Sequence, residues 1–150
     1  RADCTINIGR DSYIPESYIS DAAQRIDIYK KIAAVENEED MDDIAAELLD
    51  RYGDLPASVE TLLSISLLRA LAIECEFVQI DQTADGAVIY PRYLDIPAWS
   101  EMISLCPRKS ITVIASTKPS IRCKNVGGEP ILPYICGLLK KYIQIKFKKE

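Results

Sequence analysis

The sequence contains no histidine, the side chain that most often serves as a general base or as a neutral metal ligand. A Ser–His–Asp triad is therefore impossible. The glycine-rich phosphate-binding loops of P-loop and dinucleotide-binding proteins are also absent, as is the G-x-S-x-G turn of many hydrolases. Exposed carboxylates are plentiful, but they keep ordinary pKa values and make poor catalysts at neutral pH. The sequence thus gives no sign that this chain is an enzyme.

Cysteine is scarce, and long apolar runs are missing. The cysteines are odd in number and include no C-x-x-C pair: Cys4, Cys75, Cys106, Cys123 and Cys136. Isolated thiols predict small core residues in a reducing compartment rather than disulfides or a zinc site. No run reaches the ~18 apolar residues of a transmembrane helix, and no cleavable signal peptide is evident. We expect a cytoplasmic chain with no membrane contact, no cofactor and no metal.

What remains is an ordinary globular composition with an uneven distribution of charge. The chain has 150 residues, of which 48% are apolar and 27% charged, which suits a single domain spanning residues 1–150. It begins with an arginine, so we expect a domain excised from a longer protein. Net charge is −5, yet residues 1–104 hold 21 acids and 8 bases, whereas residues 105–150 hold 2 and 10. This asymmetry predicts opposite electrostatic surfaces or a basic tail.

Hydrophobic periodicity predicts a short strand and three helices in the first half of the chain. The strand covers residues 4–8. The first helix starts at Tyr18, with an apolar stripe of Ile19, Ala22, Ile26, Tyr29 and Ala33 that is widened by Ile28, Ile32 and Val35. The second helix is capped by Asn37 and closed by Gly53, and the third runs from Pro56 to about Glu74.

The second half alternates strands and helices. Strands are expected at 75–81 and 87–90, joined by a turn at Asp85-Gly86, and again at 111–116 and 120–125. A short helix over 97–105 carries Trp99, which we expect in the core or lining a groove. The last helix runs from Ile131 to about Tyr142, after which the sequence alternates and frays. The fold class is therefore α+β: N-terminal helices packed with a small antiparallel sheet and further helices.

The second helix raises the functional question. At ~100° per residue, its apolar residues share one sector, and Asp43, Glu47 and Asp50 fall nearly opposite, with Arg51 at the border. Such a face can be a solvated surface that aids solubility. It can also be an interface, because acids late in a helix oppose the dipole and repel one another, and a basic partner would offset both costs. The residues alone leave both interpretations open.

Two segments resemble a known family. YIPESYISDAAQRIDIYKKIA at 13–33 and ELLDRYGDLPASVETLL at 47–63 resemble the C-terminal (TRCF) domain of bacterial transcription-repair coupling factors, the Mfd family. The resemblance is dense over residues 13–72 and then continues as a compatible order of elements. Tyr52 stands where family members often carry Phe, a change that keeps the ring in the core.

The resemblance implies a regulatory domain of an ATP-driven DNA translocase that displaces stalled RNA polymerase and recruits UvrA. Such a domain packs against an N-terminal UvrB-like module of the same chain and masks the surface that UvrA binds. Carried over, the interface residues are Glu47, Asp50 and Arg51, with Asp43 on the same face. ATP and magnesium belong to the motor of the parent protein, and DNA is contacted through that motor.

Other residues allow weaker hypotheses. A group near the first helix is expected to fix the path of the chain: Tyr13, Pro15, Glu16 and Tyr18. The alternative function is a nucleic-acid-binding module that uses the basic C-terminal third, whose last lysines could contact phosphate: Lys140, Lys141, Lys146, Lys148 and Lys149. A solvated C-terminus is the competing interpretation of these lysines.

Overall fold

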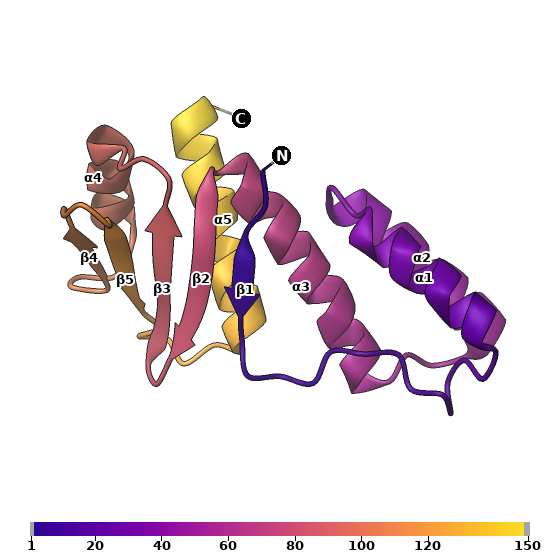
Figure 1. Ribbon diagram of the computed structural model, residues 1–150. Coiled ribbons are helices and arrows are strands. Elements are labelled where there is room, and N and C mark those ends of the chain that lie inside the picture. Colours follow the sequence, from indigo (N-terminus) through magenta and orange to yellow (C-terminus); the bar gives the residue numbers. More distant parts are fainter. Residues whose placement is uncertain (1, 149–150) are drawn as a thin grey trace. The chain divides into compact units, whose positions relative to one another are not determined.

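The computed structural model describes residues 2–148, which form two compact units. One unit is residues 9–70, and the other combines residues 2–8 with the segment from Leu71 onward. The elements, drawn in Figure 1, are β1 (Thr5–Asn7), α1 (Ala22–Ala33), α2 (Glu38–Tyr52), α3 (Ala57–Glu74), β2 (Phe77–Thr83), β3 (Gly86–Pro91), α4 (Ile96–Leu105), β4 (Ile111–Ile114), β5 (Ser120–Lys124) and α5 (Ile131–Phe147). The predicted α+β class is confirmed.

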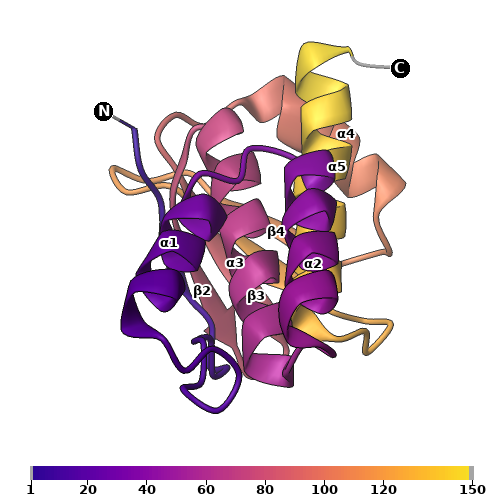
Figure 2. The ribbon, with the colours of Figure 1, turned by 90° about the vertical axis from the view of Figure 1, so that its right-hand side faces the viewer.

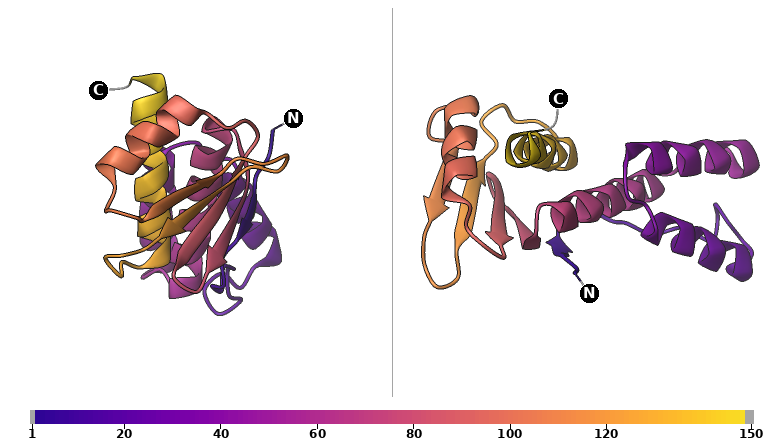
Figure 3. Two further views of the ribbon diagram at one scale, coloured as in Figure 1. Left: turned by 90° about the vertical axis from the view of Figure 1, so that its left-hand side faces the viewer. Right: turned by 90° about the horizontal axis from the view of Figure 1, so that it is seen from above.

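The unit of residues 9–70 is built from α1, α2 and the first part of α3. The start of α3 lies between α1 and α2, as two views of the ribbon agree (Figures 2 and 3). Its buried core draws on all three helices and the segment before them: Ile14, Ile19, Ile28, Ile32, Leu48, Val59 and Leu63. Because the helices contribute only a few apolar residues each, α2 depends on this shared cluster for its position.

The predicted stripe of α1 is wrong in its phase. Ile26 is 53% exposed, whereas Ile28 and Ile32 are almost completely buried. The reason is that α1 begins at Ala22, capped by Asp21, and not at Tyr18. Residues 15–19 instead form a turn, in which the amides of Tyr18 and Ile19 both donate to the Pro15 carbonyl. Ile19 is buried from this turn and therefore does not set the phase of the helix.

The second unit contains a five-stranded sheet in the order β1-β2-β3-β5-β4. β2 pairs with β3, β3 with β5 and β5 with β4 in antiparallel fashion, and the turn predicted at Asp85-Gly86 joins β2 to β3. The sheet is mixed, however, because β1 pairs with β2 in parallel, whereas sequence analysis predicted a small antiparallel sheet. A parallel neighbour requires a long crossover, which α1, α2 and α3 supply.

One face of this sheet carries the core of the second unit. α4 and α5 lie on the same side of the sheet, seen from above in Figure 3. There the rings of Phe77, Trp99 and Tyr142 contact one another, with centroids 4.8 to 6.0 Å apart, above the fully buried Ile80 and Ile89. Trp99 is therefore a core residue. Cys75 and Cys123 are also buried, and burial raises the pKa of the Cys123 thiol to about 12.

The last helix is longer than its sequence pattern predicted. α5 continues to Phe147, five residues beyond Tyr142. The alternation of IQIKF suggested an extended end, but Ile143 and Ile145 are both buried on a helix that is covered over much of its circumference. Lys146 Nζ also donates to Asp95 Oδ2 at 2.9 Å, which ties the end of α5 to the start of α4.

Candidate functional site: the exposed face of α2

The first turn of α2 is fixed by its own side chains. Asn37 accepts a hydrogen bond from the Asp40 amide (2.8 Å), and Asp40 accepts one from the Glu36 amide (3.0 Å). This reciprocal arrangement satisfies free N–H groups at the helix start, where the dipole also favours acids. Asp40 therefore has a structural role as a cap.

The far end of α2 is held by Tyr18. Its hydroxyl donates to the Gly53 carbonyl (2.8 Å) and also lies 3.2 Å from the Leu48 carbonyl oxygen, and its ring packs on Tyr52. Burial, with the charge of Asp54 adding to it, raises the pKa of the Tyr18 hydroxyl, which therefore stays protonated as a donor. Gly53, at a φ of 90°, ends the helix in a conformation that suits glycine. Tyr18, which sequence analysis expected to fix the entry into the first helix, is thus a structural residue that orients the end of α2.

Glu47 does not project freely into solvent. Lys31 Nζ donates to both of its carboxylate oxygens, at 2.9 and 3.0 Å, and Arg51 Nη1 donates to Oε2 at 2.8 Å. These hydrogen bonds, from Lys31 first and Arg51 second, hold the pKa of Glu47 below its usual value. Arg51 in turn lies over the Tyr52 ring, 4.9 Å from its centroid. Glu47 and Arg51 are therefore engaged within their own unit.

Asp43 and Asp50 are different, because both are exposed and neither side chain has a hydrogen bond or ion pair among residues 2–148. At ~100° per residue, they lie within about 20° of each other around the helix axis. Leu49, 52% exposed, lies on the Asp42 side of them. We define the acidic face of α2 as Asp42, Asp43, Leu49 and Asp50. Sequence analysis missed Leu49, although an isolated leucine outside the apolar stripe is a signal that could have found it.

The pair between Lys31 and Glu47 predicts a pH-dependent stability. Because the pKa of Glu47 is lowered in the folded chain, its contribution is present above the unfolded value of about 4.3 and is lost as pH falls. We expect Glu47→Gln to lower the free energy of unfolding by less than about 1 kcal/mol at pH 7, since exposed pairs contribute little. Urea unfolding at pH 7 and pH 3 checks this. A difference between wild type and variant that persists at pH 3 would contradict the assignment.

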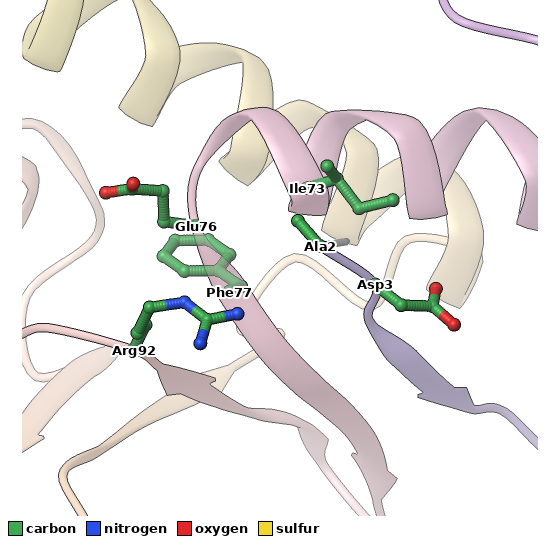
Figure 4. A pocket seen from close by; sticks show the side chains of 6 residues that line it. All are labelled: Ala2, Asp3, Ile73, Glu76, Phe77 and Arg92. Atoms are coloured by element: carbon green, nitrogen blue, oxygen red, sulfur yellow. The ribbon is translucent and has the colours of Figure 1, made fainter.

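One hollow in the second unit offers little chemistry. Its volume is about 340 Å³, and it is lined by Ala2, Asp3, Ile73, Glu76, Phe77 and Arg92. Figure 4 shows that the carboxylates of Asp3 and Glu76 point away from the Arg92 guanidinium, so no group of side chains converges on a ligand. Among residues 2–148 no three His, Cys, Asp or Glu side chains gather where they could hold a metal ion. In the same range, no helix is long and apolar enough to span a bilayer.

The chain matches a known protein family over more than half of its length. The model of the TRCF domain matches residues 8–93, which include α1, α2 and α3. The chain belongs to the TRCF domain family. The match ends before α4, β4, β5 and α5, so the acidic face of α2 lies inside the matched residues and the C-terminal third outside them.

Curated proteins similar to this chain include transcription-repair-coupling factors from several bacteria. The chain is 36% identical over 84 residues to that of Rickettsia prowazekii, 38% over 76 residues to that of Haemophilus influenzae and 35% over 81 residues to that of Bacillus subtilis. These alignments cover 56%, 51% and 54% of this chain but only 8%, 7% and 7% of the relatives. The aligned part of this TRCF chain thus spans less than a tenth of the length of the relatives it matches.

The likeness in three dimensions extends further than the family model. A crystal structure of the C-terminal domain of transcription-repair coupling factor superposes with a TM-score of 0.80 and covers 100% of this chain and 99% of that one. Sequence identity over the superposition is 24%, so this comparison establishes the fold. It includes α4, β4, β5 and α5, the elements that the family model leaves out.

Proposed function

We propose that this TRCF domain is an autoinhibitory docking domain, which binds an N-terminal UvrB-like module of the same parent protein and masks the surface that UvrA would bind. The single observation that carries the proposal is the acidic face of α2: two unpaired carboxylates, Asp43 and Asp50, beside an exposed Leu49. An apolar residue rimmed by charges is the usual arrangement of a protein interface. The partner surface is accordingly basic, with an apolar depression for Leu49.

The four interface residues divide into two roles in this proposal. Asp43 and Asp50 contact the basic partner directly, since neither carboxylate is paired with another side chain among residues 2–148. Glu47 and Arg51 act as positioning residues, because Glu47 is satisfied by Lys31 and Arg51, which leaves few of its lone pairs for a partner. Held together, these side chains and Tyr18 keep α2 in one orientation, so that little conformational entropy is lost on docking.

Weak contacts suffice for such a clamp. A tethered partner acts at an effective concentration of up to millimolar, so a modest intrinsic affinity keeps the closed state populated. Exposed charge pairs contribute about 0.2–1 kcal/mol each. The clamp opens when RNA polymerase and DNA engage the parent protein and favour another arrangement. In this proposal the domain has no chemistry of its own; ATP and magnesium serve the parent motor in the bacterial cytoplasm.

The decisive variant reverses the charges that have no partner in their own unit. We expect Asp43→Lys/Asp50→Lys to weaken binding to the separately expressed N-terminal module by at least about tenfold, because attraction becomes repulsion at two positions. In the full-length parent protein, the same variant should bind UvrA more tightly and hydrolyse ATP faster. Calorimetry of the two-part complex and an ATPase assay provide the measurements.

The matched control is Glu76→Lys/Glu101→Lys, which makes the same change of charge at two exposed acids of the other unit. It should leave binding to the N-terminal module and ATP turnover near their wild-type values. Circular dichroism confirms that both variants are folded. If reversing Asp43 and Asp50 changes neither UvrA binding nor ATP turnover, the acidic face of α2 is a solvated surface and the proposal fails.

A further inference from the structure

The face of the sheet opposite α4 and α5 carries polar side chains that the docking proposal does not use. Strand register places Thr112 of β4, Arg122 of β5 and Val88 of β3 side by side, and Lys124 follows two residues after Arg122 on the same face. Thr112, Arg122 and Lys124 are all exposed. Antiparallel sheets commonly present one face to water, but that face normally mixes charges of both signs.

The charges on this part of the sheet are nearly all positive. A hollow of about 300 Å³ lies over β3, β5 and the start of β4, and three cations line it: Lys109, Arg122 and Lys124. Three residues that carry hydroxyls, Thr83, Ser110 and Thr112, line it as well. Its one carboxylate, that of Asp85, accepts a hydrogen bond from Thr83 at 3.4 Å. The hollow therefore sets three cationic side chains against a single acid, with three hydroxyl-bearing residues beside them.

A fourth cation extends the row along the sheet. Lys118 Nζ lies 4.9 Å from the centroid of the Tyr90 ring, and Tyr90 follows Val88 by two residues, which puts it on the same face. We call Lys109, Lys118, Arg122 and Lys124 the basic track. None of the four forms an ion pair with a carboxylate among residues 2–148, and the sequence has no acid between Glu101 and Glu129.

The lysines at the chain end are less suited to bind an anion than sequence analysis suggested. Lys146 is paired with Asp95. Lys140 has a contact within the chain, and Lys141 is half-buried beside a different hollow. Lys148 is exposed at the end of α5, and Lys149 lies outside the described residues. The accessible positive charge of the C-terminal third therefore lies mainly on the β4–β5 hairpin and the segment before it.

We propose that the basic track binds the phosphate backbone of a nucleic-acid strand without reading its sequence. A phosphodiester backbone carries one negative charge on every unit, and the track presents cations at successive positions, with Arg122 and Lys124 about 6.6 Å apart along β5. Arginine favours phosphate through its planar fork of donors. Beside this row, the exposed Lys118 can leave the Tyr90 ring, whose face then accepts a stacked base. An acidic peptide would pair with the cations of the basic track, but it has no base to stack on the Tyr90 ring.

The test measures binding of the 150-residue chain to a fluorescein-labelled 12-nucleotide single strand by anisotropy over a range of KCl concentrations. We expect binding that weakens steeply with salt. Arg122→Ser/Lys124→Ser should weaken it about tenfold or more at low salt. The same variant should reduce the slope of log K against log salt by about 1.4, because two phosphate contacts are lost at about 0.7 each.

The control is Arg10→Ser/Lys30→Ser, which removes the same charge from two exposed bases of the other unit. It should leave affinity within about twofold and the salt slope unchanged. Three results would overturn the proposal: no binding by the wild-type chain at low salt, equal losses in the two variants, or equally tight binding of a poly-glutamate of the same length. None of these substitutions lies on α2. A negative result in this test therefore leaves the docking proposal unaffected, and the reverse also holds.

Discussion

Leu48→Ala should lower the free energy of unfolding of the chain by about 3 to 5 kcal/mol, which is the range for leucine-to-alanine changes at sites that cannot collapse. Leu48 has no exposed surface and belongs to the core cluster of residues 9–70 together with Ile28, Ile32 and Val59. Three helices line that cluster, and none can move into the cavity without leaving its other contacts. The loss therefore combines missing burial with a retained void.

The neighbouring residue supplies a matched control. Leu49 is 52% exposed on the same helix, so Leu49→Ala should change the free energy of unfolding by less than about 0.5 kcal/mol. Urea unfolding followed by circular dichroism measures both variants under one condition. Equal effects of the two substitutions would mean that α2 does not rest on the core cluster. The position of the acidic face would then have no structural basis.

This dependence explains how far the fold was predictable. The capping of α2 by Asn37 and its end at Gly53 were predicted correctly, because caps depend on residues three or four positions apart. The parallel pairing of β1 with β2 was not predicted, because it joins residues more than 70 positions apart and leaves no local pattern. The phase of α1 failed for a related reason: Ile19 is buried from a turn rather than from the helix.

The candidate site shows the same division. A helical wheel is enough to place Asp43 and Asp50 on one exposed face. It also puts Glu47 four residues before Arg51, a spacing that favours an ion pair. It cannot show that Lys31 of α1 reaches the same carboxylate, since that contact depends on the packing of α1 against α2. Sequence therefore identified the acidic residues, and the structure separated those that are free to meet a partner from those already engaged.

The basic surface was located only in part. The charge balance correctly placed positive charge in residues 105–150, and the last lysines were the obvious candidates. Strand register instead puts Arg122 and Lys124 on one face, in line with Thr112 and next to Lys109. Period-2 alternation brings together residues that a count of lysines cannot relate to each other. The binding hypothesis thus moves from the chain end to the hairpin.

Gly86→Ala should be the most damaging small substitution in the second unit, with a loss of about 3 kcal/mol or more in the free energy of unfolding. A Cβ at this position would lie 1.9 Å from the carbonyl oxygen of Cys123, far closer than nonbonded heavy atoms approach each other. The obstacle is backbone, so no rotamer change relieves it. β3 has to move away from β5, which breaks the backbone pairing of residue 86 with Lys124. Such overpacking costs more free energy of unfolding than a typical surface substitution.

Gly137→Ala is the control, because a Cβ there meets nothing within 4 Å and the residue lies inside α5. We expect it to stabilise the chain by about 0.5 to 1 kcal/mol, since alanine has the higher helix propensity. Thermal unfolding should therefore shift in opposite directions for the two variants. Gly86→Ala should also weaken binding of the labelled single strand, because the loss of β3–β5 pairing displaces Arg122 and Lys124. If Gly86→Ala unfolds at the wild-type temperature, then β3 and β5 do not approach as closely as described. The placement of Arg122 and Lys124 in the basic track would then be wrong as well.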